Sequence, residues 1–127
     1  MKLLAVPPDR VGDFWPIAVG HISAAMARNG ITPLDDVQAD VFNGFALLWL
    51  AVEDDIVHGA GVTKLCGDIC EIVAWGCDKQ SRCTALLTEI EEYARAEGCT
   101  AVRLVGPRAW QRITGYDRKA VILEKVI

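Results

Sequence analysis

The apolar residues in the C-terminal part of the chain switch from helical to extended spacing. Over 84–97 they form one stripe with charged residues on the opposite side, which predicts an amphipathic helix. The residues of the stripe are Leu86, Leu87, Ile90, Tyr93, Ala94 and Ala96. Gly98 predicts the end of this helix, because glycine readily adopts the positive φ found just past many helices. Residues 101–105 then predict a short strand, and Gly106-Pro107 opens a second short helix.

The N-terminal part of the chain predicts a strand at 3–6 and two helices. Asp13 is expected to cap the first helix, from 14 to about 28, with a proline tolerated in its first turn. We expect the inner face of this helix to hold Phe14, Ile17, Ala18, His21, Ile22 and Ala25. Thr32-Pro33 predicts the start of the second helix, in which Thr32 is the cap, and Asn43-Gly44 predicts its end.

The middle and the end of the chain have the pattern of β-structure. The strands predicted here are 45–52, 56–65, 69–75 and 120–127. The first of these is apolar throughout, which is typical of a strand covered on both faces. Acidic residues at 53–55 predict the turn of an antiparallel hairpin. Gly59 and Gly61 indicate a bulge or a close approach by another backbone.

Length and composition indicate a single globular domain over 1–127. Hydrophobic residues make up 52% of the chain and its mean hydropathy is +0.25, which argues against disorder. The apolar run at 45–52 is too short to span a bilayer. Pro7-Pro8 interrupts the N-terminal apolar residues before they could form a signal peptide. We therefore expect a cytoplasmic protein without membrane association.

The five cysteines are an odd number and lack the pattern of a disulfide scaffold, so free thiols in a reducing compartment are expected. Cys66 and Cys70, with Cys77 and Cys83 downstream, could form a zinc site. No CxxC pair or His pair accompanies them, and we expect no metal. Cys77 and Cys83 could instead be reactive thiols, although the local sequence holds no His to pair with them.

The formal charge of −4 is unevenly distributed. Residues 1–60 contain three Lys or Arg and eight Asp or Glu. Residues 99–127 contain six Lys or Arg and two Asp or Glu. A solvated surface would account for this. A protein partner, or self-association of the acidic N-terminal half with the basic C-terminal end, is the other interpretation. Aromatic residues do not interleave with the basic ones as in a single-strand-binding platform, so no sequence-specific nucleic-acid binding is expected.

The predicted order is β-α-α-β-β-β-α-β-α-β, and it resembles the GCN5-related N-acetyltransferase (GNAT) fold. The most specific segment is IEEYARAEGCTAVRLVG, followed by a short helix and Gly115-Tyr116. It is similar to the family's long helix, its fifth strand, and the Gly-Phe pair before the last strand. The resemblance implies an α/β (α+β) fold with a mixed, mostly antiparallel sheet, and acetyl-CoA as cofactor if the protein is active.

The resemblance also implies a pyrophosphate-binding loop at the start of the central helix. The family's loop is Gln/Arg-x-x-Gly-x-Gly/Ala, where backbone N–H groups and the helix dipole bind the anion. The corresponding residues are Gln80, Ser81, Arg82, Cys83, Thr84 and Ala85. Gln80 and Ala85 match the outer positions, whereas Cys83 replaces the glycine that permits close approach. Asp78 adds an unfavourable negative charge, which Arg82 would partly offset.

For catalysis, Glu71 is the candidate base that takes the proton of the amine; the alternative is an exposed strand carboxylate. In many GNAT enzymes a Tyr four residues before the Gly-Phe pair is the acid. That position is Gln111 here, beside Trp110, and neither is a usable acid. Tyr116 occupies the position of the family's Phe. It is the remaining catalytic candidate, and the alternative is a packed aromatic whose hydroxyl has a partner.

A second resemblance is to small GNAT-like proteins encoded among tailed-phage structural genes. Its segments are NGFALLWLAVEDD, IEEYARAEGCTAVRLVG and AWQRITGYDRKAVILEK. It implies a virion component with a structural or adaptor role. With the altered loop and the missing acid, the sequence favours a catalytically impaired GNAT-fold protein, in the cytoplasm or in a phage particle. The alternative is an active acetyl-CoA-dependent N-acetyltransferase acting on a small amine or a protein amine.

Overall fold

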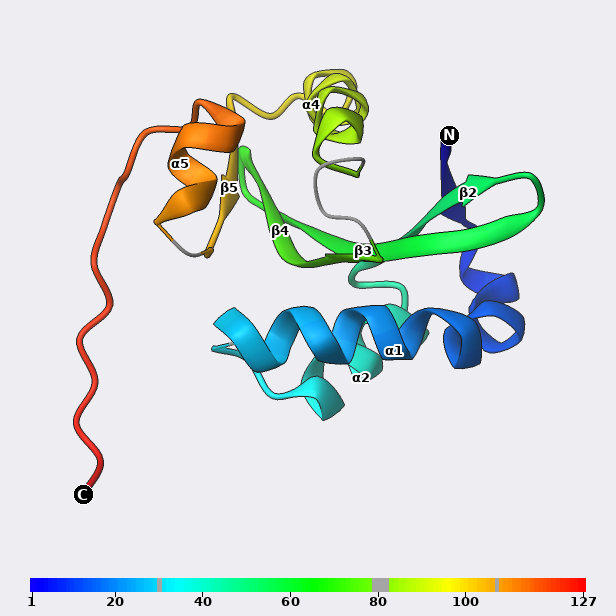
Figure 1. Ribbon diagram of the computed structural model, residues 1–127, viewed down its shortest axis with the longest axis horizontal. Helices are drawn as coiled ribbons and strands as arrows, with labels where there is room; N and C mark the ends of the chain where they lie inside the picture. Colours follow the sequence, from blue (N-terminus) through cyan, green and yellow to red (C-terminus); the bar gives the residue numbers. More distant parts are fainter. Residues whose placement is uncertain (30, 79–82, 107) are drawn as a thin grey trace.

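A computed structural model of the chain describes residues 1–29, 31–78, 83–106 and 108–127, and places one five-stranded sheet between helices (Figure 1). The strands, in sheet order, are β1 (Lys2–Val6), β2 (Leu47–Glu53), β3 (Ile56–Cys66), β4 (Ile69–Cys77) and β5 (Ala101–Leu104). The helices are η1 (Pro8–Arg10), α1 (Val11–Asn29), α2 (Leu34–Phe42), η2 (Thr84–Leu86), α4 (Leu87–Ala96) and α5 (Ala109–Thr114). Neighbouring strands are antiparallel from β1 to β4, and β4 and β5 are parallel.

The hairpin of β2 and β3 follows the sequence pattern closely. Asp54 and Asp55 both adopt positive φ, 52° and 62°, in the turn between the strands. Such a turn matches the twist of the two strands and favours the antiparallel pair. The register then shifts next to Gly59, and a Cβ at Gly59 would lie 2.7 Å from the backbone carbonyl oxygen of Gly76. The prediction of a bulge or a close approach by another backbone is therefore confirmed at Gly59. At Gly61 the neighbour is the ring of Trp75, which any Cβ would meet.

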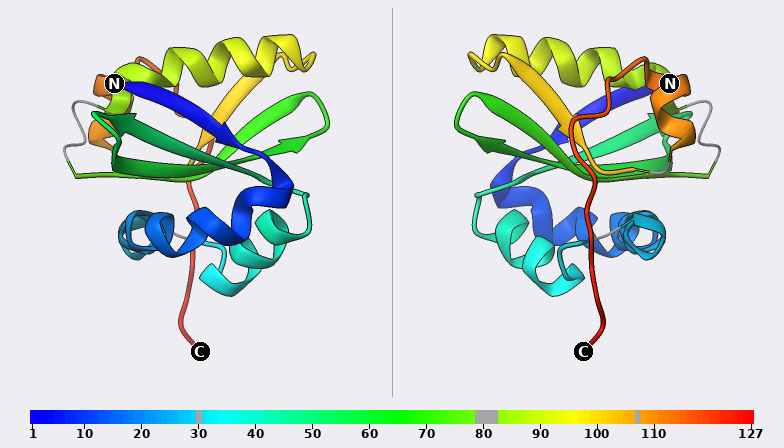
Figure 2. Two further views of the ribbon diagram at one scale, coloured as in Figure 1. Left: turned by 90° about the vertical axis from the view of Figure 1, so that its right-hand side faces the viewer. Right: turned by 90° about the vertical axis from the view of Figure 1, so that its left-hand side faces the viewer.

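The sheet separates two hydrophobic cores. α1 and α2 cover one face and α4 covers the other (Figure 2). In β2, Leu48 and Leu50 belong to the first core, and Trp49 and Ala51 to the second. β2 is thus covered on both faces, as its apolar sequence predicts. The buried hydroxyl of Thr63 accepts a hydrogen bond from the Trp49 indole N–H at 2.9 Å.

The first two helices differ from the prediction in detail. α1 begins at Val11, directly after the 3-10 turn, and Asp13 pairs with Arg10 instead of capping the helix. Ile17 is 53% exposed although the sequence pattern placed it inside, whereas Ala18, Ile22 and Ala25 are buried as expected. The buried residues of α1 are Val11, Trp15, Ala18, Ile22 and Ala25. The cap of α2 is Pro33 without a side-chain hydrogen bond, so the prediction that Thr32 caps it is wrong.

The predicted final strand at 120–127 is absent. The chain after α5 runs away from the sheet as an extended, exposed segment (Figures 1 and 2). Leu123 is 89% exposed there, and no strand among the described residues pairs with this segment. A strand requires a neighbouring strand for its backbone groups, and an apolar sequence alone does not supply one. None of the described helices combines the length and apolar character needed to cross a membrane.

Candidate functional site

β4 and β5 run side by side and then part. Their backbones pair as far as Ile72 and Leu104, where β5 ends, whereas β4 continues to Cys77. At the same point the register between β3 and β4 shifts and leaves Val73 as an extra residue in β4. A bulge of this kind bends and twists its strand, which accounts for the separation. The backbone of β4 beyond Ile72 therefore faces an opening instead of a neighbouring strand.

A small cavity of about 20 Å³ lies at this opening, between α1, β4 and α5. Leu104 and Trp110 bound it on one side, and no ionisable side chain lines it. Trp75 also lines it, and the buried indole N–H of Trp75 has no hydrogen-bond partner among the described residues. A buried donor of this kind normally has an acceptor. The cavity holds about one water molecule, so a longer chain could enter only if Leu104 or Trp110 moved.

A larger cavity of about 120 Å³ lies on the α2 side of β3 and β4, and Val73 lines both cavities. Its polar lining includes Asp40, Lys64 and Glu71. Lys64 Nζ donates a hydrogen bond to Asp40 Oδ2 at 3.1 Å, and that hydrogen bond and charge raise the pKa of Lys64. Glu71 is half-buried, and Cys66 Sγ lies 3.7 Å from its Oε2. The structure thus places Glu71 in a polar cavity beside the point where β4 parts from β5.

The predicted anion-binding loop is described only in part. Gln80, Ser81 and Arg82 lie outside the described residues. Cys83 is fully buried, Thr84 begins η2, and Ala85 is exposed. Neither η2 nor α4 has a side-chain hydrogen bond at its N-cap. A capping side chain therefore does not compete with an anion for the backbone N–H groups at these two positions.

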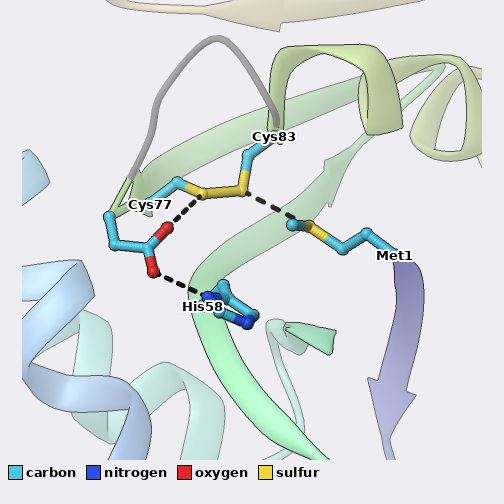
Figure 3. Close-up of a disulfide and its surroundings, with 5 residues drawn as sticks. Met1, His58, Cys77 and Cys83 are labelled. Atoms are coloured by element: carbon cyan, nitrogen blue, oxygen red, sulfur yellow. Dashed lines mark hydrogen bonds and ion pairs between the residues drawn. A yellow bond between two sulfur atoms is a disulfide. The ribbon is translucent and has the colours of Figure 1, made fainter. Parts of the chain in front are cut away.

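Cys77 and Cys83 form a disulfide between the end of β4 and the start of η2, with Cα atoms 6.2 Å apart (Figure 3). The expectation of free thiols is wrong for these two and confirmed for Cys66, Cys70 and Cys99. The bond depends on where the end of β4 and the start of η2 lie in the fold, which cysteine spacing does not indicate. Burial raises the pKa of Cys70 to about 11. Among the described residues, no group of three or more His, Cys, Asp or Glu could hold a metal ion.

His58 lies beside this disulfide, although the local sequence of the cysteines contains no His (Figure 3). His58 Nδ1 and Asp78 Oδ2 share a hydrogen bond of 2.7 Å, and Asp78 Oδ1 lies 3.7 Å from Cys77 Sγ. On the other side, Cys83 Sγ lies 3.9 Å from Met1 Sδ. The antiparallel pairing of β3 with β4 brings His58 here from 20 residues away. His58 thus gives the Asp78 carboxylate a hydrogen-bond partner close to the start of η2.

Tyr116 lies away from both cavities. Its hydroxyl donates a hydrogen bond to Glu91 Oε2 on α4 at 2.7 Å. Burial, together with this carboxylate, raises the pKa of the Tyr116 hydroxyl well above its usual range. Gln111, at the position of the family's acid, is exposed on α5, and the neighbouring Trp110 lines the small cavity. The structure therefore brings Glu71 to the opening between the strands, but neither Tyr116 nor Gln111.

Comparison with known proteins identifies the fold. No family model and no curated protein matches the chain. Among solved structures, an aminoglycoside acetyltransferase from an uncultured soil metagenomic sample superposes with a TM-score of 0.71 at 11% identity. The match covers 99% of this chain and 95% of that one. That protein has also been solved in complex with sisomicin.

Two further structures hold the cofactor or part of it. A predicted acetyltransferase with acetyl-CoA from Clostridium acetobutylicum has a TM-score of 0.67 at 14% identity, covering 98% of this chain and 95% of that one. An aminoglycoside N-acetyltransferase in complex with CoA has a TM-score of 0.66 at 10% identity, covering 99% of each chain. At such identities the likeness concerns the fold alone. The chain has the fold of GNAT acetyltransferases, and the predicted fold class is confirmed.

Proposed function

We propose that this chain is an acetyl-CoA-dependent N-acetyltransferase acting on a small amine or a protein amine. The observation that carries the proposal is the position of Glu71. Glu71 lines the 120 Å³ cavity, and this cavity shares Val73 with the cavity at the β4–β5 opening. Transfer of an acyl group requires the donor and the amine to meet at one point with a base beside the amine. The two adjoining cavities offer such a meeting point.

The described residues fit acetyl-CoA in three respects. The edge of β4 beyond Ile72 offers backbone donors and acceptors to an extended chain that contains amide groups. The buried N–H of Trp75 is a donor without an acceptor among the described residues. Among the described residues, no side chain caps the helix start after Cys83, which favours an anion there. When bound, acetyl-CoA supplies the thioester, whose C–S bond breaks as the new C–N bond forms.

Glu71 is the side chain that would take the proton released by the amine. Asp40, the other carboxylate of the cavity wall, is held by Lys64 at 3.1 Å. Glu71 has a thiol at 3.7 Å as its hydrogen-bond neighbour, so its carboxylate keeps acceptor capacity for an ammonium group. Half-burial also limits its contact with water. A positively charged or polar amine is therefore the acceptor that this cavity suits.

The second candidate is a structural or adaptor protein without acetyl transfer, of the virion-associated type that the phage-like segments suggest. Its specific support is Cys83, which is buried and bonded to Cys77 where the family's loop has glycine. The exposed Gln111 at the position of the acid adds to it. On this view the fold is retained for its surface, and the cavity at Glu71 is incidental.

The two candidates are separated by measuring acetylation of a panel of amines with acetyl-CoA, by mass spectrometry. For the enzyme, Glu71→Gln should lower the rate by about 10²–10⁴-fold, as expected for loss of a general base. Glu92→Gln, an identical change on the exposed side of α4, should leave the rate unchanged. Equal rates for Glu71→Gln and the parent protein would overturn the role of Glu71. Absence of acetylation across the panel would favour the adaptor.

A further inference from the structure

The Cys77–Cys83 disulfide joins the two ends of the segment that holds the proposed anion-binding loop. Cys77 ends β4 and Cys83 directly precedes η2, at a sequence separation of 6. The other three cysteines of the chain are free thiols, so this bond does not belong to a disulfide scaffold. Both of its residues lie in the core between the sheet and α4. The bond therefore fixes one local junction and does not join the two cores.

Each sulfur of this pair already has a hydrogen-bond acceptor beside it. Asp78 Oδ1 lies 3.7 Å from Cys77 Sγ, and Met1 Sδ lies 3.9 Å from Cys83 Sγ (Figure 3). A disulfide sulfur carries no proton and cannot donate, whereas a thiol can donate to a carboxylate and, weakly, to a thioether. His58 holds the Asp78 carboxylate in position through a hydrogen bond of 2.7 Å that does not involve either sulfur. The surroundings thus accommodate the reduced pair as well as the oxidised pair.

The two sulfurs differ in their access to solvent. Cys77 is partly exposed, whereas Cys83 is fully buried. The course of thiol–disulfide exchange depends on which sulfur a thiolate can reach, and here that sulfur is Cys77 Sγ. When a dithiol reductant attacks it, the S–S bond breaks and Cys83 leaves as a thiolate that takes up a proton. The second thiol of the reductant then displaces Cys77, which is also protonated. The reductant becomes a disulfide, and the cysteine pair has gained two electrons and two protons.

We infer that the Cys77–Cys83 pair is a redox-sensitive latch on the helix start at η2. For its ligand, the pyrophosphate of acetyl-CoA, this latch rests on the function proposed above. In the oxidised chain the bond holds the helix start against the end of β4, so its backbone N–H groups are ordered before an anion arrives. In the reduced chain the anion must order this junction as it binds, and the loss of conformational freedom lowers the affinity. Reducing conditions therefore weaken the binding of acetyl-CoA.

Calorimetric titration with acetyl-CoA, before and after treatment with dithiothreitol, measures this effect. The reduced parent should bind about 10-fold more weakly than the oxidised parent, because a cross-link that closes a short loop removes part of its conformational freedom. Cys77→Ser should bind as the reduced parent does and should not respond to dithiothreitol. Cys99→Ser is the matched control, because Cys99 is a free thiol packed against the same core. This control should keep the full response. Equal affinities of the oxidised and the reduced parent would overturn the latch.

Hydrogen exchange tests the latch without acetyl-CoA. On reduction the amides of 84–87 should exchange about 10-fold faster, whereas those of β2 should stay protected because the fold remains intact. Treatment of the folded chain with glutathione should place the mixed disulfide on Cys77, as read from peptide masses. Unchanged exchange at 84–87, glutathione on Cys83, or loss of protection in β2 would each overturn the latch. If acetyl-CoA bound in neither redox state, the proposed function would fail, and the exchange rates alone would decide for or against the latch.

Discussion

Gly76 lies on β4 where α1 crosses the sheet, and its missing side chain allows the two backbones to touch. A Cβ at this position would be in hard contact with the carbonyl oxygen of His21 and 2.8 Å from its carbonyl carbon. Ordinary contacts of a Cβ lie at 3.4–4 Å. Overpacking typically costs about 1–3 kcal/mol. Because the obstacle is helix backbone, which cannot rotate aside, we expect Gly76→Ala to lower the free energy of unfolding by about 3 kcal/mol.

Urea unfolding followed by tryptophan fluorescence measures this loss directly. Gly20→Ala is the matched control, because Gly20 lies in α1 with nothing within 4 Å of its Cβ position. That change should raise the free energy of unfolding by roughly 0.5–1 kcal/mol, since alanine favours the helix. The mid-point of thermal unfolding of Gly76→Ala should fall by roughly 10 °C. If Gly76→Ala unfolded within about 0.5 kcal/mol of the parent, α1 could not cross β4 as closely as described.

Three further predictions concern buried groups and cysteines. Thr63→Val should lower the free energy of unfolding by about 1–3 kcal/mol, because it leaves the Trp49 indole N–H buried without an acceptor. Thr63→Ser should lower it less, because it keeps the hydroxyl. Equal losses of stability in the two variants would contradict the hydrogen bond. Burial raises the pKa of the Cys70 thiol from 9.0 to about 11, so this thiol should resist alkylation in the folded protein at pH 9. The free energy of unfolding should fall as pH rises from 9 to 11, because the thiol then ionises more readily in the unfolded chain. Thiol titration of the denatured, unreduced chain should find three free thiols, whereas five would exclude the Cys77–Cys83 disulfide.

Local patterns in the sequence predict most of the fold. The apolar run of β2, the acidic turn after it and the stop at Gly98, which has a φ of +84°, each depend on short-range chemistry. The buried face of α1 was predicted only in part. Trp15 is buried and Ile17 is exposed, because packing in the core with α2 and the sheet selects which apolar residues of the helix are covered. The prediction of a strand at 120–127 is wrong, because no strand among the described residues lies beside this segment to pair with its backbone.

Glu71 stays a prediction as a catalytic residue. The sequence placed it on the strand before the central helix, and the structure adds the cavity that it lines. Lys64 and Asp40 join it through packing of α2 on β3, and the pair His58–Asp78 through strand register. Contacts of this kind join residues at least 20 positions apart, and no local spacing indicates them.

Calorimetric titration of the chain with acetyl-CoA measures whether the proposed cofactor binds. We expect a saturable heat with a dissociation constant below about 1 mM, and a rise in the temperature of unfolding at saturating ligand. Glu71→Gln should bind acetyl-CoA as the parent does, because the proposal assigns Glu71 to the amine and not to the cofactor. Absence of both the heat and the thermal shift would contradict the proposal that the opening between β4 and β5 is an acetyl-CoA site.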